Sequence, residues 1–232
     1  MKICIQQPLY LPYPGFFDKI AKTEKCVIFD TAQFVRRNFQ NRNRIRVPQG
    51  SKWLTVPVEA ELGIQIKDVL INNKVQWREN HWKSIEYNYK NAEYFEQYSS
   101  DFFKIYSKDW ESLVELDVGI IKVINKILGI NKEVALASSF GEIQKKSTEL
   151  LIEICKRANA DKYLSGEFGK DYIDESVFEK AGIELCYQVY KCPEYSQRFD
   201  GFVPNMSVID LIFNHGKDSL KILAGKDEAN QK

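Results

Sequence analysis

The first thirty residues contain short apolar runs separated by polar residues, in an order that is typical of an α/β unit. Lys2 to Gln6 has the pattern of a short strand, and residues 15–25 carry apolar side chains at helical spacing. Residues 26–30, CVIFD, form a continuous apolar run that a carboxylate closes. A strand, a helix and a buried strand in this order predict two parallel strands joined by a right-handed crossover.

The segment between the first strand and the first helix is rich in proline. Pro8, Pro12 and Pro14 fall within seven residues, and proline at that density excludes both a helix and a central strand. We expect a stiff loop at the carboxyl end of the first strand. Because proline fixes its φ angle in advance, such a loop loses little entropy when a ligand binds.

The middle of the chain changes from extended to helical patterns. Residues 39–47 and 53–58 alternate as strands do, with Pro48 and Gly50 in the turn between them, and residues 66–71 predict a further strand. Residues 75–128 contain no proline, one glycine and apolar side chains at helical spacing. We predict two or three helices there, as a helical insertion or cap.

The α/β rhythm returns in the last hundred residues. Ser207, with Asp210 three residues later, predicts the start of a final helix that ends at Gly216. The whole pattern predicts an α/β fold with an open, mostly parallel, Rossmann-like sheet in one domain over residues 1–223, the helical insertion at about 75–130 and a polar tail at 224–232. Before Ser207, the expected strands lie at 134–140, 162–166 and 183–190, and the expected helices at 147–160 and 176–182.

Composition narrows the class of protein. The 33 basic and 32 acidic residues leave a net charge of +1, which argues against a general nucleic-acid-binding surface. Five cysteines form an odd set without a CxxC pair, as in reduced intracellular proteins, and no cysteine–histidine spacing indicates a metal site. With no signal peptide and no apolar run of about 18 residues, we expect a cytoplasmic protein without membrane insertion. The sequence is also compatible with a homo-oligomer.

The strongest chemical signal is a cluster of arginines. Residues 36–46 hold five of them, and no acidic residue occurs from Thr31 to Val58. In an extended strand, Arg42, Arg44 and Arg46 share one face, where they either face water on an edge strand or share an anion such as a phosphate or diphosphate. The flanking Arg37 and the asparagines of the other face, Asn41 and Asn43, belong to the same candidate site.

Two further segments could contact a ligand. Ser165, Gly166, Gly169 and Lys170 follow a predicted strand, and their glycines would let backbone N–H groups approach an anion. The alternative is an ordinary glycine turn with a solvated lysine, since the spacing is not that of a P-loop. The tyrosine-rich run at residues 190–199, which includes Tyr195, could line a sugar or ring pocket, and Tyr10 and Tyr172 are further candidate binding residues.

The carboxyl ends of the first two strands supply the remaining candidates. Ligands bind at this edge in open parallel sheets, which favours Gln6, Gln7 and Pro8 as binding residues. Asp30 could be a ligand contact, a Mg²⁺ ligand or the partner of Arg36. The candidate catalytic groups are Asp30 and His81, although His81 shares the apolar stripe of its helix and could equally be a hydrogen-bonded core residue.

Four blocks in order resemble the WbqC-like protein family: IQQPLYLPYPGFFDKI, VIFDTAQFVRRNFQNRNRIR with WLTVPV, YLSGEFGKDYI, and FVPNMSVIDLIFNHG. The family's first block usually begins with histidine, where this chain has Gln6, so chemistry that needs an imidazole there does not transfer. His81 falls where the family tends to have a histidine. Members occur among genes for bacterial O-antigen, or lipopolysaccharide, and other surface polysaccharides.

The resemblance implies work on an activated sugar. The first hypothesis is a transferase or ATP-dependent amide ligase that modifies a nucleotide-linked (amino)sugar by acyl or aminoacyl transfer to a sugar amine, with ATP and Mg²⁺ required if the acyl group is activated on the protein. The partner would be a nucleotide sugar or another phosphorylated small molecule. The alternatives are a non-catalytic ligand-binding or scaffold protein and, by likeness of fold alone, a nucleotidylyltransferase-like enzyme.

Overall fold

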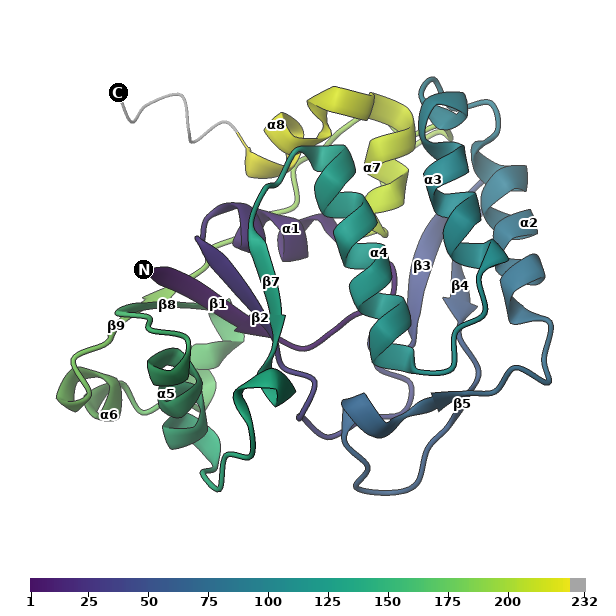
Figure 1. The fold of residues 1–232 in the computed structure, drawn as a ribbon. Helices are drawn as coiled ribbons and strands as arrows, with labels where there is room; N and C mark the ends of the chain where they lie inside the picture. Colours follow the sequence, from purple (N-terminus) through teal and green to yellow (C-terminus); the bar gives the residue numbers. More distant parts are fainter. Residues whose placement is uncertain (226–232) are drawn as a thin grey trace.

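A five-stranded parallel sheet forms the centre of the molecule, in a computed structural model that describes residues 1–225 (Figure 1). The strand order is β7-β2-β1-β8-β9, so the chain starts in the middle of the sheet and builds outward in both directions. All four pairings are parallel, with Cys4 opposite Cys26 between β1 and β2. The strands are β1 (Lys2–Gln6), β2 (Lys25–Ile28), β7 (Glu133–Leu136), β8 (Lys162–Ser165) and β9 (Glu184–Tyr187).

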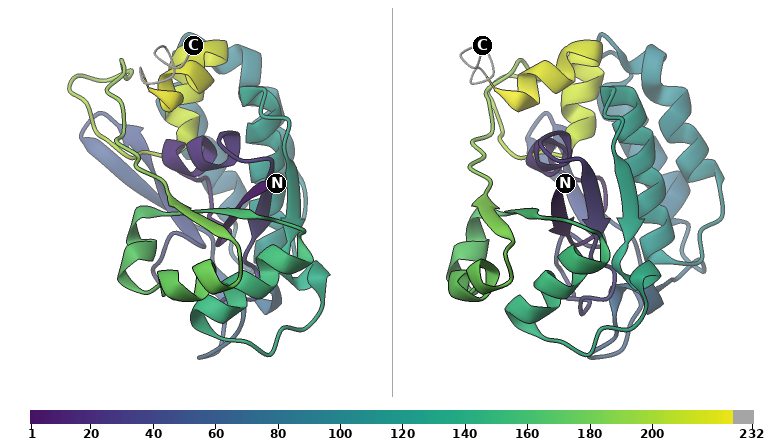
Figure 2. Two further views of the ribbon diagram at one scale, coloured as in Figure 1. Left: turned by 90° about the vertical axis from the view of Figure 1, so that its left-hand side faces the viewer. Right: turned by 60° about the vertical axis from the view of Figure 1, so that its left-hand side comes forward.

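Alternation along β1 gives the sheet two apolar faces. Ile3 and Ile5 pack with α5 (Ser147–Arg157) and α6 (Glu175–Lys180), whereas Cys4 points into the larger core on the side of α1 (Pro14–Ala21). Figure 2 shows α5 and α6 on one side of the sheet and α1 on the other. The predicted α/β fold with an open, mostly parallel sheet is therefore confirmed.

The segment between β2 and β7 adds two small sheets and three helices. The first small sheet is the antiparallel hairpin β3 (Arg42–Val47) and β4 (Gly50–Thr55); the second pairs β5 (Val58–Glu59) with β6 (Leu70–Ile71). Three helices follow, as expected between residues 75 and 128: α2 (Trp77–Tyr89), α3 (Phe95–Ser107) and α4 (Leu113–Leu128). Their buried residues join the core on the α1 side of the sheet.

The chain ends with α7 (Val208–His215) and α8 (Ser219–Ala224). The Ser207 hydroxyl accepts a hydrogen bond from Ile209 N–H at the start of α7, and Gly216 ends that helix with φ of 53°. Both limits agree with the prediction. The predicted polar tail spans residues 224–232, and its residues after Gly225 lie outside the described part of the chain.

Two of the predicted strands are partly replaced by 3₁₀ turns in the structure. Residues 66–71 form a 3₁₀ turn, η1 (Ile66–Asp68), before the two-residue β6, and β7 ends at Leu136, where a second 3₁₀ turn, η2 (Ala137–Phe140), begins. In η2 the Ser138 backbone N–H and hydroxyl both donate to the Asp30 carboxylate. This tertiary contact turns the chain away from the sheet, and no local apolar pattern could indicate it.

Candidate functional site

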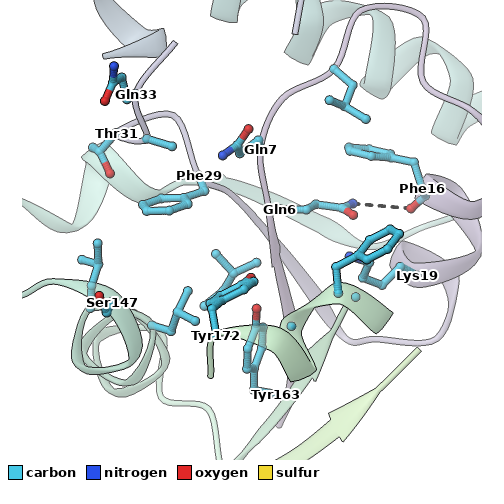
Figure 3. A pocket seen from close by; sticks show the side chains of 18 of the residues that line it. Gln6, Gln7, Phe16, Lys19, Phe29, Thr31, Gln33, Ser147, Tyr163 and Tyr172 are labelled. Carbon is cyan, nitrogen blue, oxygen red and sulfur yellow. Dashed lines mark hydrogen bonds between the residues drawn. The ribbon is translucent and has the colours of Figure 1, made fainter. Parts of the chain in front are cut away.

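A cavity of about 1140 Å³ lies at the carboxyl ends of β2, β1 and β8 (Figure 3). The chain passes from β1 toward one edge of the sheet and from β8 toward the other, so the cavity sits where the strand order reverses. Open parallel sheets bind ligands in this crevice. Its walls come from the ends of these three strands, from α1, from the loop after β2, from the start of α5 and from the η3 turn (Glu167–Asp171) after β8.

Lys19 brings a buried charge to the cavity. Its side chain belongs to α1 and is only 8% exposed, yet within residues 1–225 its ammonium has neither a hydrogen-bond partner nor an ion-pair partner. The Nζ atom approaches the loop after β8 so closely that a β-carbon at Gly166 would lie 3.4 Å from it. Burial lowers the pKa of Lys19, which the nearby Cys4 and Cys26 sulfurs oppose.

The electrostatic character of the cavity is positive. Three lysines line it, Lys19, Lys145 and Lys146, and no aspartate or glutamate of the described chain does. Lys145 forms an ion pair of 3.4 Å with the exposed Glu149. Lys146 precedes the first turn of α5, where no side chain caps the helix. A helix N-terminus carries a partial positive charge and unpaired N–H groups, which reinforce the lysines.

Gln6 and Gln7 bring amide groups from the end of β1. The Gln6 Nε2 atom makes only long contacts, 3.4 Å to the Phe16 carbonyl and 3.6 Å to the Cys26 sulfur. The Gln7 carbonyl oxygen accepts a hydrogen bond of 2.7 Å from Gln40 Nε2. This bond directs the Gln7 side chain and leaves its own N–H₂ group without a partner among residues 1–225. Both amides can therefore bind hydroxyl or phosphate oxygens.

Aromatic rings form much of the remaining wall. Phe29 follows β2, Tyr163 is the second residue of β8, and Tyr172 follows the η3 turn. Figure 3 shows Tyr163 and Tyr172 across the cavity from Gln7 and the Phe29 ring beside Thr31, with Ser147 of α5 and Lys19 at the two ends of the cavity. Burial raises the pKa of both tyrosines, so their hydroxyls stay protonated. Such rings offer flat apolar faces for a sugar or a base.

The structure brings five of the predicted binding residues together in this cavity: Gln6, Gln7, Gly166, Gly169 and Tyr172. Gly169 packs closely on Ser165, because a β-carbon there would lie 2.1 Å from the Ser165 hydroxyl oxygen and would displace that side chain. Ser165 itself is buried beneath the turn, and Lys170 points outward with its Nζ 5.3 Å from the Tyr187 ring centroid. The glycine turn thus contributes backbone and space to the cavity.

His81 lies away from the cavity, in an aromatic cluster of the helical segment. Its Nδ1 is 2.8 Å from the Tyr10 hydroxyl, which is also 2.7 Å from the Tyr106 hydroxyl. The Trp77 ring packs edge-on against the imidazole. Burial lowers the pKa of His81 to about 4, so the imidazole is neutral at pH 7. His81 and Tyr10 thus contact each other inside the protein, and neither lines the cavity.

Asp30 and the prolines of the first loop also pack inside the protein. Asp30 is 1% exposed and accepts its hydrogen bonds from Ser138, while the Arg36 guanidinium donates to the Ala60 carbonyl. Asp30 is therefore not the partner of Arg36. Pro8 is buried beside Gln7 and does not line the cavity.

The three arginines of β3 have different surroundings. Arg46 is 2% exposed and donates to the carbonyls of Gly50, Asp200 and Gly201, which ties the β3–β4 turn to the loop before α7. Arg42 and Arg44 lie over the Trp53 ring, with 4.3 and 5.6 Å between guanidinium carbon and ring centroid. None of the three lines the cavity.

The other predicted binding residues serve the scaffold or a second hollow. The Asn43 amide donates to the Leu11 carbonyl at 2.7 Å and so holds the proline-rich loop. The Tyr195 hydroxyl donates to the buried Asp210 carboxylate at 2.9 Å. Arg37 and Asn41 line a smaller hollow that also includes Arg42.

Sequence reasoning did not identify several cavity residues. Lys19 left a readable signal, because it falls three residues after Phe16 on an otherwise apolar helix face. Lys145 and Lys146 directly precede a predicted helix, a combination typical of anion sites. Other missed residues, for example Phe29, Gln33 and Tyr163, depend on tertiary proximity alone.

Residues 1–225 contain neither a metal-binding cluster nor a membrane-spanning helix. No group of three or more histidine, cysteine, aspartate and glutamate side chains is placed to hold a metal ion. No helix in the same range is both long and apolar enough to cross a membrane.

Comparisons with known proteins place the chain in a family. The model of the WbqC-like protein family matches residues 7–222. The "Uncharacterized protein Rv1507c" of Mycobacterium tuberculosis is 34% identical over 224 residues, which are 94% of this chain and 95% of that protein. The "Uncharacterized protein MJ1005" of Methanocaldococcus jannaschii is 35% identical over 75 residues, 32% of this chain and 56% of that protein. No solved structure matches significantly. The chain therefore belongs to the WbqC-like protein family.

Proposed function

We propose that this protein binds a nucleotide-linked sugar in the cavity at the carboxyl edge of its sheet and modifies that sugar during surface-polysaccharide synthesis. The reaction proposed is transfer of an acyl or aminoacyl group to a sugar amine. The observation that carries the proposal is Lys19, whose side chain is nine-tenths buried and whose ammonium has no counter-charge in the described chain and lines a cavity without a carboxylate of residues 1–225.

An anionic ligand explains this arrangement physically. A buried cation without a partner destabilises the folded protein, and a phosphate in the cavity would supply the missing charge. The volume of about 1140 Å³ exceeds what a single phosphate needs and is large enough for a nucleotide sugar. The amides of Gln6 and Gln7 suit sugar hydroxyls, and the rings of Phe29 and Tyr172 suit a sugar or a base.

The test is thermal stabilisation by a panel of uridine, thymidine and guanosine diphosphate sugars and ATP, measured on the native protein and on Lys19→Met. At a ligand concentration of 100 times Kd, binding raises the melting temperature by about 5–10 °C in a protein of this size. We expect this shift for at least one nucleotide sugar with the native protein and a small or absent shift with Lys19→Met.

Lys170→Met is the matched control, because it removes a neighbouring charge whose side chain points away from the cavity. It should respond to the ligand as the native protein does. If no member of the panel stabilises the native protein, or if Lys19→Met and the native protein respond alike, the proposed ligand class is wrong.

A non-catalytic ligand-binding protein is the second candidate. It is favoured by the cavity lining, which includes no carboxylate, imidazole or thiol of the described residues that could serve as a nucleophile or general base. Incubation of the protein with the bound nucleotide sugar and acyl donors, followed by mass spectrometry of the sugar, separates the two. A mass increase that depends on the protein identifies an enzyme, and binding without any change identifies the binding protein.

A further inference from the structure

Phe168 is an exposed aromatic residue at the rim of the large cavity, which we call the main cavity. It is 80% exposed, and Tyr172, which also lines the main cavity, is 62% exposed. Among residues 1–225, no aromatic ring stacks on either of them, and the Tyr172 hydroxyl has no hydrogen-bond partner. One rim of the cavity therefore carries two rings that the protein leaves largely uncovered.

The η3 turn holds both rings in place from below. Gly169 packs closely on the buried Ser165, and its carbonyl accepts a hydrogen bond of 2.9 Å from the Ile173 N–H. Ile173 itself belongs to the apolar core that contains α5 and α6. The backbone under Phe168 and Tyr172 is thus anchored to the core, although the rings themselves are not. Such rings are ready to stack on a ligand without a large loss of backbone entropy.

The side chains that the η3 turn brings to the cavity are aromatic and uncharged. Its charged residues, Glu167, Lys170 and Asp171, do not line the cavity. A sugar placed against this rim would leave most of its hydroxyl groups without a protein partner. A nucleobase is flat and stacks on aromatic side chains whatever its sequence identity, and its polar edge can stay in water at an open rim. The rim therefore suits a base better than a sugar.

The opposite wall suits the sugar. Figure 3 shows Thr31 and Gln33 on the side of Gln7, across the cavity from Tyr172. The Gln7 N–H₂ group and the side chains of Thr31 and Gln33 make no hydrogen bond with any residue of the described chain. These hydroxyl and amide groups offer both donors and acceptors, which sugar hydroxyls require.

Lys19 lies where the phosphates of such a ligand would pass. Its Nζ atom is so near the start of the η3 turn that a β-carbon at Gly166 would lie 3.4 Å from it, and Phe168 follows two residues later. We propose that Phe168 stacks on the base of the bound nucleotide sugar, with the diphosphate at Lys19 and the sugar against Gln7 and Gln33. This orientation rests on the proposed function, because it requires a nucleotide sugar in the main cavity.

The test is isothermal titration calorimetry of the native protein and Phe168→Ala with three pairs of ligands: UDP and UDP-glucose, dTDP and dTDP-glucose, and GDP and GDP-mannose. Each pair shares its base and diphosphate and differs only in the sugar. We expect Phe168→Ala to weaken the nucleoside diphosphate and its nucleotide sugar by the same factor, about tenfold or more. Phe168→Tyr keeps a ring at this position and should bind both nearly as tightly as the native protein.

Tyr87→Ala is the matched control, because Tyr87 is an aromatic residue of α2 that is 74% exposed and does not line the main cavity. It should bind every ligand as the native protein does. Both alanine variants remove an exposed ring, so we expect melting temperatures close to that of the native protein. A large drop for Phe168→Ala would show that its ring stabilises the fold and would contradict the proposal.

The outcomes separate this orientation from the proposed function. If Lys19→Met weakens a nucleotide sugar but Phe168→Ala binds it as the native protein does, the orientation is wrong and the proposed function stands. If Phe168→Ala weakens only the nucleotide sugar and leaves its nucleoside diphosphate unaffected, Phe168 contacts the sugar and the orientation is again wrong. If the native protein binds none of the six ligands, both the orientation and the proposed function are wrong.

Discussion

Lys19 is the residue at which stability and the proposed function have opposite requirements. Its burial in α1 lowers its pKa below the value of 10.5 that it has in the unfolded chain. Between the folded and unfolded pKa values, the unfolded chain binds more protons than the folded one, so the free energy of unfolding rises with pH in that window. Below the folded pKa, the charged lysine destabilises the fold by a constant amount. A side chain with this cost fits a binding role.

The first prediction follows for Lys19→Met, which keeps the length of the side chain and removes its charge. We expect the variant to be more stable than the native protein at pH 7, on the order of 1 kcal/mol, and to lack the rise in stability toward pH 10. Urea unfolding of both proteins at several pH values measures this. A variant that is less stable at pH 7 would show that Lys19 has a stabilising partner.

His81 provides a second residue-scale prediction, on pH dependence. Its pKa of about 4 lies below the ordinary 6.5. The folded protein therefore loses stability as pH falls from about 6.5 to 4, by up to about 3 kcal/mol, and this contribution is flat below pH 4. In His81→Gln, urea unfolding at pH 7 and pH 4.5 should show a smaller difference than in the native protein.

The same variant addresses the role of His81. Because His81 contacts Tyr10 and Trp77 outside the cavity, His81→Gln should bind nucleotide sugars with unchanged affinity wherever it is folded. A folded variant with strongly weakened binding would contradict the structural role and restore His81 as a site residue.

At the scale of elements, the sequence predicted those whose signals are local. The βαβ start, the three helices after residue 75 and the Ser207 and Gly216 limits of α7 all follow from periodicity and capping. The C-terminal end of β7 and the form of residues 66–71 do not follow from such local signals. The hydrogen bond from Ser138 to Asp30 fixes the former, and the pairing of β6 with β5 contributes to the latter. The arginine strand has the expected extended form, but alternation could not show that Arg46 is enclosed by the loop at 199–201.

Helix α4 contains a buried carboxylate that yields an element-scale prediction. Asp117 is fully buried, neither of its oxygens has a partner among residues 1–225, and burial raises its pKa well above 3.8. The pKa of Asp117 is higher in the folded protein than in the unfolded chain. Its contribution to stability is therefore complete below about pH 4 and decreases as the pH rises toward the folded pKa. Asp117→Asn should therefore be more stable than the native protein at pH 7.

The comparison is made by urea unfolding at pH 4 and pH 7, with Asp109→Asn as the exposed control. The gain in stability of Asp117→Asn should be larger at pH 7 than at pH 4. An equal gain at both values would show that Asp117 does not titrate between them.

At the scale of the whole molecule, one segment of chain lines two hollows that both contain cationic side chains. Residues 29–41 contribute Phe29, Thr31 and Gln33 to the main cavity, and Arg36 and Arg37 to the smaller hollow that Asn41 and Arg42 also line. Within this segment the Gln40 side chain accepts from the Val35 N–H and donates to Gln7. The sequence predicted an anion site on the arginines and also predicted Gln6 and Gln7, of which only the two glutamines line the main cavity. It could not separate Lys19 from the arginines, because tertiary structure alone places them in different hollows.

The measurement that tests the central claim most directly is the pKa of Lys19 with and without a nucleotide sugar. Competitive acetylation, with mass spectrometry of the peptide that contains Lys19, gives the labelling rate of its neutral amine at each pH. Without ligand, Lys19 should titrate below 10.5; with the stabilising nucleotide sugar, its pKa should rise and its labelling should slow, while Lys170 stays unchanged. A nucleotide sugar that binds but leaves the pKa and labelling of Lys19 unaltered would contradict the account.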